Sequence, residues 1–217
     1  MELYIYDHCP YCTRARMILG LKKISYSEII LDNDDEKTPI TMIGKKSLPI
    51  LKFKENQYLG ESLDIVSYIE SIDENKSLTL SRNIDIENWV KNIELSIYEL
   101  AIPRWAFSSF KEFNKISARM YFIDKKQAAL GNFSELINLS AEKIDFINGE
   151  LNILNKLIDI NLLKKSHQSW SYTDIFLFPI LRSLSIVKGI VWPENVLYWM
   201  EKMSEECGIS LHSDIAL

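Results

Sequence analysis

Apolar and polar positions in the first third of the chain alternate between strand-like and helix-like spacing. Leu3 to Tyr6 is a run of aliphatic and aromatic residues that predicts a strand. Between residues 15 and 21, apolar side chains recur at helical spacing, which predicts a helix directly after that strand. Further strands are predicted at 25–31, 48–53 and 57–59, and further helices ending near Gly44 and beginning at Ser62. The order β-α-β-α-β-β-α over residues 1–72 indicates a mixed α/β domain.

The pattern changes after this segment. Residues 73–83 are polar and lack a strong apolar period, which indicates a linker. No strand-like alternation follows it, and long helical patterns fill residues 84–217, so we expect an all-α domain there. The expected helices lie at 84–112, 116–130, 133–159, 173–188 and 194–205. Pro103 should bend or end the first of them.

Two smaller features belong to the folding of this second domain. Ser171 and Asp174 form a capping-box pattern, in which each side chain can bond to the backbone amide of the other residue. We expect this pair to serve folding rather than chemistry. Beyond Gly208, the apolar residues of the tail can pack against a domain face. They are Ile209, Leu211, Ile215 and Leu217.

Composition narrows the classes of function. The 217 residues are 47% hydrophobic, enough for a substantial core, and the net charge of −5 argues against general nucleic-acid binding. The N-terminus lacks the pattern of a signal peptide, and no apolar run reaches the roughly 20 residues that a membrane span needs. Three cysteines do not suggest a secreted disulfide framework. We therefore expect a soluble protein of the reducing cytoplasm.

The stretch that carries chemistry is Asp7-His8-Cys9-Pro10-Tyr11-Cys12, where the first strand gives way to the first helix. The first-turn amides of a helix lack intrahelical partners, and the helix dipole adds partial positive charge there. A thiolate at Cys9 should therefore be stabilised, which would lower its pKa from about 8.5 into a range of roughly 3.5–7.5. Pro10 suits the first helical turn. Cys12 lies one turn further on the same face, within reach of a disulfide.

The residues alone leave three interpretations of this Cys-x-x-Cys pair open: a redox pair, half of a zinc site, or two unreactive buried cysteines. A zinc site needs two more ligands at suitable spacing. His8 is adjacent to Cys9, whereas the other candidates stand apart near the far end of the chain. They are His167, Cys207 and His212. The redox interpretation is the strongest of the three, and we expect no metal.

The motif and its flanks resemble a known family. Residues 3–12, followed by Ala15-Arg16-Met17, are similar to the active site of the two-domain bacterial glutaredoxins of the glutaredoxin-2 type. Further similar stretches lie at 42–44, 48–51, 61–66 and 122–126. The resemblance implies a thioredoxin-like fold for residues 1–72, followed by an all-α domain at 84–217 in a glutathione-transferase-like layout.

The resemblance also implies a glutathione-dependent thiol-disulfide oxidoreductase that reduces glutathione mixed disulfides. Cys9 would be the nucleophile and Cys12 the resolving thiol, and together they would form the redox-active disulfide. The implied partners are glutathione as co-substrate, glutathionylated proteins and small disulfides, and the implied state is a monomer. A conjugating transferase of the cysteine type and a non-enzymatic glutathione-binding module are the alternatives. The presence of Cys12 counts against both.

Five residues are expected to bind glutathione, from three parts of the α/β domain: Tyr11, Leu48, Pro49, Glu61 and Ser62. The family's cis-proline loop implies a cis bond before Pro49, with the Leu48 backbone facing the cysteine moiety of glutathione. Ser62 begins a helix and can hold the γ-glutamyl carboxylate, while Glu61 can accept the ammonium group. Tyr11 would lie over the rim of the site.

Other residues have lesser or open roles. His8 could support the thiolate if protonated, and Cys207 is expected to be a bystander. The cation that binds the glycine carboxylate is left open among Arg16, Lys22, Lys23, Lys45 and Lys46. The tryptophans are expected in the core or the domain interface rather than in a ligand site. They are Trp89, Trp105, Trp170, Trp192 and Trp199.

Overall fold

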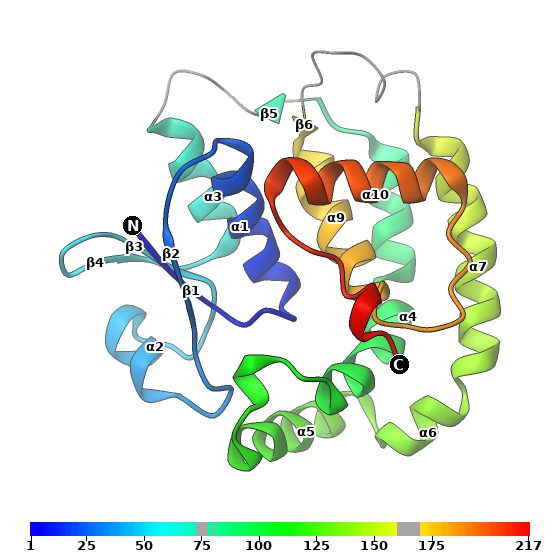
Figure 1. Ribbon diagram of the computed structural model, residues 1–217, viewed down its shortest axis with the longest axis horizontal. Coiled ribbons are helices and arrows are strands. Elements are labelled where there is room, and N and C mark those ends of the chain that lie inside the picture. The colour runs from blue at the N-terminus through cyan, green and yellow to red at the C-terminus, as the bar shows by residue number, and fades with distance from the viewer. Residues whose placement is uncertain (73–77, 80, 160–169) are drawn as a thin grey trace.

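A computed structural model describes residues 1–72, 78–79, 81–159 and 170–217 (Figure 1). The predicted order of elements in the N-terminal part is confirmed, with boundaries that differ by a few residues. The elements are β1 (Glu2–Ile5), α1 (Pro10–Leu21), β2 (Ser27–Ile30), α2 (Lys37–Ile43), β3 (Ile50–Lys54), β4 (Gln57–Leu59) and α3 (Ser62–Ser71). Residues 73–77 and 80 lie outside the described residues, so the linker at 73–83 stays a prediction.

The four strands form one sheet in the order β2-β1-β3-β4. β1 is parallel to β2 and antiparallel to β3, which is antiparallel to β4. Tyr4 pairs with Ile50 and Leu51 pairs with Leu59. The end of β1, the start of β3 and the end of β4 therefore meet at one edge of the sheet. The loops that leave this edge and the first turns of α1 and α3 carry the residues that the sequence predicts for the site.

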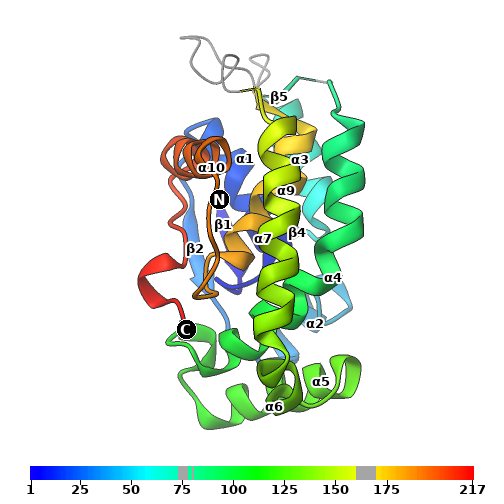
Figure 2. The same ribbon diagram turned by 90° about the vertical axis from the view of Figure 1, so that its right-hand side faces the viewer.

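The rest of the described chain is mainly helical, and the predicted α/β plus all-α architecture is confirmed. Its helices are α4 (Ile84–Phe107), α5 (Ile116–Leu130), α6 (Phe133–Asn138), α7 (Ser140–Leu157), α9 (Tyr172–Leu184) and α10 (Glu194–Cys207), with 3₁₀ turns at Lys111–Phe113 and Ser213–Ile215. α4 packs against both α9 and α7, and the three helices run beside one another (Figures 1 and 2). The predicted capping box is present, with the Ser171 amide 2.7 Å from an oxygen of Asp174.

Three details of the helical part differ from the sequence-based expectation. α4 ends at Phe107 rather than near Glu112, and it continues past Pro103, so this proline does not end the helix and a bend there stays a prediction. Residues 133–159 form two helices, α6 and α7, that meet at Leu139, where the Ser140 hydroxyl donates to the Leu136 carbonyl and receives a hydrogen bond from Arg104. Short strands β5 (Leu78–Thr79) and β6 (Trp170–Ser171) pair in parallel. Two residues per strand are too few to leave an alternating pattern in the sequence.

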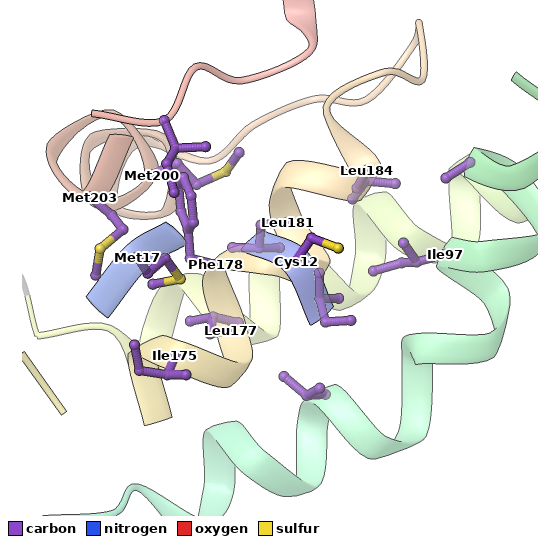
Figure 3. Close-up of a cluster of buried hydrophobic side chains, with 14 of the residues drawn as sticks. Cys12, Met17, Ile97, Ile175, Leu177, Phe178, Leu181, Leu184, Met200 and Met203 are labelled. Atoms are coloured by element: carbon purple, nitrogen blue, oxygen red, sulfur yellow. The ribbon is translucent and has the colours of Figure 1, made fainter. Parts of the chain in front are cut away.

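Helix α1 joins the two parts of the molecule, because it packs against α3 on one side and against α9 and α10 on the other. Figure 3 shows Cys12 and Met17 of α1 in one apolar cluster with Phe178 of α9 and Met200 of α10. All four side chains are fully buried. The resolving-thiol candidate thus lies in the core between the domains.

The close approach of α1 and α10 depends on Gly20. A Cβ atom on this residue would lie 2.0 Å from the backbone oxygen of Cys207. Downstream of α10, Ile209 is buried, and Leu211 and Ile215 pack against the core, as expected for the tail. Leu217 is exposed at its side chain, but its amide bonds to the Ile186 carbonyl at 2.9 Å.

Candidate active site

Cys9 lies between the end of strand β1 and the start of helix α1. It occupies the N-cap position of α1, with Pro10 as the first helical residue. The Cys9 carbonyl accepts hydrogen bonds from the amide and the hydroxyl of Thr13, at 3.0 and 3.1 Å. The side chain is partly exposed, and all three cysteines of the chain are free thiols. The predicted strand-to-helix position of this residue is confirmed.

The two thiols of the motif differ strongly in acidity. A hydrogen bond from the Cys12 thiol, helped by the charge of His8 and by the amides of Cys12 and Tyr11, lowers the pKa of Cys9 to about 6, although burial opposes this shift. Burial raises the pKa of Cys12 well above its usual range. The sequence argument assigned the stabilisation of Cys9 to the helix terminus. The structure gives the largest share to Cys12 and a smaller one to the helix amides.

His8 is buried beside the nucleophile and is bonded to the helical domain. Its Nδ1 lies 2.7 Å from Oε1 of Glu112, and its backbone amide donates to the same oxygen at 3.1 Å. Glu112 belongs to the 3₁₀ turn Lys111–Phe113 and is completely buried. A carboxylate distant in sequence therefore fixes both the ring and the backbone of the residue that precedes Cys9.

Cys9 opens into a cavity of about 200 Å³ that both domains line. The α/β domain contributes His8, Cys9, Pro10 and Tyr11, and the helical domain contributes Tyr98, Ile102, Trp105 and Lys126. Tyr11 is 48% exposed, which fits the expected place at the rim. The three α4 residues follow helical spacing, and the sequence pattern alone assigned Trp105 to the core. Trp105 is indeed buried, but it also faces the nucleophile's cavity.

The other predicted glutathione-binding residues lie at the same edge of the sheet. The Leu48–Pro49 peptide is cis and leads directly into β3, opposite the end of β1. Glu61 and Ser62 follow β4 and begin α3, and the Ser62 side chain is buried. Glu61 has a φ angle of 62°, a left-handed conformation that is rare for residues other than glycine. The structure brings all of these segments to one side, but their contacts with a ligand remain predictions.

Four of the five candidate cations for the glycine carboxylate, all except Lys23, already have partners. Lys45 forms an ion pair with Glu61. Lys46 donates to the Asn33 carbonyl at 2.5 Å and lies over the ring of Tyr121. The remaining pairs are Arg16 with Asp7 at 2.7 Å and Lys22 with Glu70 at 3.6 Å. The structure thus leaves the glycine-carboxylate role unassigned.

Sequence reasoning missed the polar contacts that the helical domain makes to the active-site loop, which is the segment Asp7-His8 before Cys9. Arg182 of α9 is 3% exposed and donates to the Asp7 carbonyl at 2.6 Å and to the Asp7 carboxylate at 2.8 Å. Burial alone would raise the pKa of Asp7, but the charges of Arg182 and Arg16 hold it well below its usual range. Neither Arg182 nor Glu112 carries a local sequence signal, because each is distinguished only by its distant partner.

The described residues contain no cluster of three or more His, Cys, Asp and Glu side chains suited to a metal ion. His167, one of the candidate zinc ligands, lies outside them. Cys207 is buried, and burial raises its pKa to about 11, which agrees with an unreactive thiol. Among the same residues, every helix is too short or too polar to cross a lipid bilayer.

Comparisons with known proteins agree with this geometry. The family model described as glutaredoxin 2, C-terminal domain, matches residues 85–216, and that of the glutathione S-transferase N-terminal domain matches residues 3–77. Glutaredoxin 2 of Escherichia coli strain K12 is 43% identical over 219 residues, covering 100% of both chains.

Solved structures give the same relationship. A crystal structure of glutaredoxin 2 from Salmonella typhimurium in complex with glutathione is 43% identical, with a TM-score of 0.94 over 100% of this chain and 98% of that chain. A Tau class glutathione S-transferase from mango is 15% identical, with a TM-score of 0.56 over 100% of this chain and 92% of that chain. The second similarity is one of fold alone.

Proposed function

The chain belongs to the glutaredoxin 2 family, and from this premise we propose that it reduces glutathione mixed disulfides with Cys9 as nucleophile and Cys12 as resolving thiol. As a glutaredoxin, the chain is a glutathione-dependent thiol oxidoreductase. The finer proposal concerns which of its atoms react and which hold glutathione.

One observation carries the assignment of roles: the two thiols are close in space but differ in acidity and access. Cys9 lines the cavity, and with a pKa of about 6 it is mostly thiolate at neutral pH. Cys12 is fully buried and, with its raised pKa, stays protonated. The thiolate is the form that attacks disulfides, so Cys9 is the group that meets the substrate.

The reaction follows from this difference. The Cys9 thiolate attacks the glutathione sulfur of a mixed disulfide, and the second thiol leaves as a thiolate that takes up a proton. Cys9 is then disulfide-bonded to glutathione. A second glutathione thiolate attacks the glutathione sulfur of that bond, which forms glutathione disulfide and releases the Cys9 thiolate. In the two-thiol route, Cys12 loses its proton and attacks the Cys9 sulfur, which releases glutathione and forms the Cys9–Cys12 disulfide.

The sheet edge beside Cys9 provides groups that suit glutathione. Ser62 offers an amide and a hydroxyl at the N-terminus of α3, where an anionic carboxylate is favoured. Glu61 offers a carboxylate for the ammonium group, which would replace the Lys45 partner it has here. The Leu48 backbone before Pro49 would align with the cysteine moiety, and Tyr11 would cover it from the rim. The bound state of the Salmonella typhimurium relative supports glutathione as the ligand.

The partners and setting that we propose follow from the same chemistry. The substrates are glutathionylated proteins and small disulfides, which place their glutathione part along the sheet edge and their second part against the cavity that α4 lines. The enzyme acts as a monomer in the cytoplasm, where glutathione is abundant and disulfides are reduced.

The test is a glutathione-coupled turnover assay with a small glutathione mixed disulfide. Cys9→Ser should abolish turnover, because a hydroxyl does not replace the thiolate. Cys12→Ser should keep much of the activity, because a second glutathione can resolve the intermediate. If Cys12→Ser were inactive and Cys9→Ser active, the assignment of roles would be wrong. Activity of the native chain with a chloronitrobenzene but not with the mixed disulfide would instead favour a conjugating transferase.

A further inference from the structure

Glu112 is a buried carboxylate that the proposed reaction does not use. Its side chain is 0% exposed and comes from the helical domain, while both hydrogen bonds that it makes with the described residues are with His8. Its second oxygen, Oε2, is buried without a hydrogen-bond partner in the described residues. An ionised carboxylate in such a place is strongly unfavourable unless a positive group neutralises it.

His8 is the group in position to do so. Its Nδ1 lies 2.7 Å from Glu112, and aromatic rings surround the imidazole, with centroids 5.0 Å away for Trp105, 5.1 Å for Phe113 and 5.2 Å for Phe122. The faces of aromatic rings favour a cation. His8 is 5% exposed, so water contributes little to the stabilisation of a charge on its ring.

Other groups that can carry charge face His8 from several elements, and among the described residues it is Glu112 that hydrogen-bonds to its ring. The groups are Tyr6, Cys9, Tyr98, Glu112, Lys126 and His212. Lys126 lies across the cavity and opposes a second positive charge. Burial lowers the pKa of His212 well below its usual range, so its ring is neutral at neutral pH.

We propose that Glu112 is a positioning residue that holds His8 as an imidazolium beside Cys9, so that the helical domain takes part in activating the nucleophile. The proposal rests on the proposed role of Cys9 and adds a group that acts on it through His8. One carboxylate oxygen accepts from both the ring and the amide of His8, which fixes where the positive charge lies relative to the next residue.

The ion pair acts on the two thiols in opposite directions. The positive charge of His8 lowers the pKa of Cys9, and the negative charge of Glu112 raises that of Cys12. In each case it adds to a larger cause, the hydrogen bond from Cys12 for the first thiol and burial for the second. The pair is thus oriented so that it widens the difference in pKa between Cys9 and Cys12.

The experiment measures the pH dependence of iodoacetamide alkylation at Cys9, read by mass spectrometry of its peptide in the full-length reduced protein. Glu112→Gln keeps the shape of the side chain but removes its charge. Its alkylation midpoint should rise by about one pH unit, since an opposite charge nearby shifts a pKa by roughly that much. Glu135→Gln, an exposed carboxylate of α6, is the matched control and should leave the midpoint unchanged.

Two further measurements separate the proposal from a merely structural role. In a His8→Asn background, Glu112→Gln should no longer raise the midpoint, because the group through which Glu112 acts is gone. In the unmodified protein, ¹⁵N spectra of labelled histidine should show both ring nitrogens of His8 protonated at pH 7. A neutral His8 ring would overturn the proposal, as would an upward shift that persists without His8. Neither measurement needs glutathione or turnover, so both stay informative if the proposed reaction is wrong.

Discussion

The two ends of helix α1 meet the helical domain in different ways. At its N-terminal end the contacts are polar and directional, since Asp7 bonds to Arg182 and His8 bonds to Glu112. At its C-terminal end the contact is one of packing, where Gly20 lies against the backbone of Cys207 at the end of α10. The helical domain therefore makes a charged interface with the residues just before α1, beside the reactive thiol, and a close-packed interface with the far end of this helix.

This difference shows how the helical domain can both stabilise the α/β domain and change the acidity of its thiols. Directional bonds place charges at defined positions, which is what the acidity of a thiol responds to. Close packing contributes stability but no charge. We therefore expect changes at the polar end to alter stability and its pH dependence or the acidity of Cys9, and changes at the packed end to alter stability alone.

The largest effect is expected for Arg182→Met. Removing this guanidinium leaves the Asp7 carboxylate with Arg16 as its remaining cation, at 2.7 Å, and breaks the bonds that tie Asp7 to α9. Loss of one member of such a pair lowers the free energy of unfolding by about 3–5 kcal/mol when the pair is well buried, and by less here because the Asp7 side chain is 32% exposed. Urea denaturation at pH 7 measures the difference. The comparison is Arg14→Met, because Arg14 is a buried guanidinium that lies over the rings of Tyr11 and Phe176 and has no ion-pair partner among the described residues.

The same variant should change the response to acid. The folded-state pKa of Asp7 lies below its unfolded value of about 3.9, so this group stabilises the protein above that pH and its contribution is lost as the pH falls below about 4. Arg182→Met should therefore lose less stability between pH 5 and pH 3 than the unmodified protein does. An equal loss in both proteins would show that the pair does not couple folding to protonation.

A somewhat smaller loss is expected at the packed end. Gly20→Ala puts a methyl group where the Cys207 carbonyl lies, and such overpacking lowers the free energy of unfolding by about 1–3 kcal/mol. Gly149→Ala in α7 is the matched control, because a Cβ there meets no atom within 4 Å. It should raise the free energy of unfolding by about 0.5–1 kcal/mol. A changed alkylation midpoint of Cys9 in Gly20→Ala would contradict the separation of the two ends.

The smallest effect is expected for Cys12→Ala, and it is measured through the acidity of the Cys9 thiol. If the hydrogen bond from Cys12 is the main cause of the low pKa of Cys9, the alkylation midpoint should rise from about 6 by at least about one pH unit. Cys12→Ser retains a donor and should shift it less. An unchanged midpoint in Cys12→Ala would mean that the amides at the start of α1 set the acidity, as the sequence argument held.

Local signals explain what could be predicted. The apolar run Leu3 to Tyr6 and the Cys-Pro-Tyr-Cys motif together place Cys9 at a helix start, and Ser62 marks the start of α3. The order of elements follows from apolar periodicity. The cis geometry before Pro49 came from the family resemblance rather than from the residues themselves. These features depend on neighbours within a few positions in the chain.

The contributions of the helical domain were not predictable in this way. Glu112 is 104 residues from His8, and Arg182 is 175 residues from Asp7. In the sequence both are ordinary charged residues in helical surroundings, where the default expectation is a solvated surface. Only the packing of α9 and the 3₁₀ turn against the active-site loop makes them buried partners.

The sequence by itself determined the order of elements, the position of the nucleophile and the division into an α/β and a helical part, because apolar period, caps and turn residues act locally. The tertiary structure alone decided the environment of the two thiols. Acidity depends on charge, burial and hydrogen bonding at distances of a few ångströms. For Cys12 the helical domain supplies part of these through Glu112 and through Phe178 and Met200 of the apolar cluster.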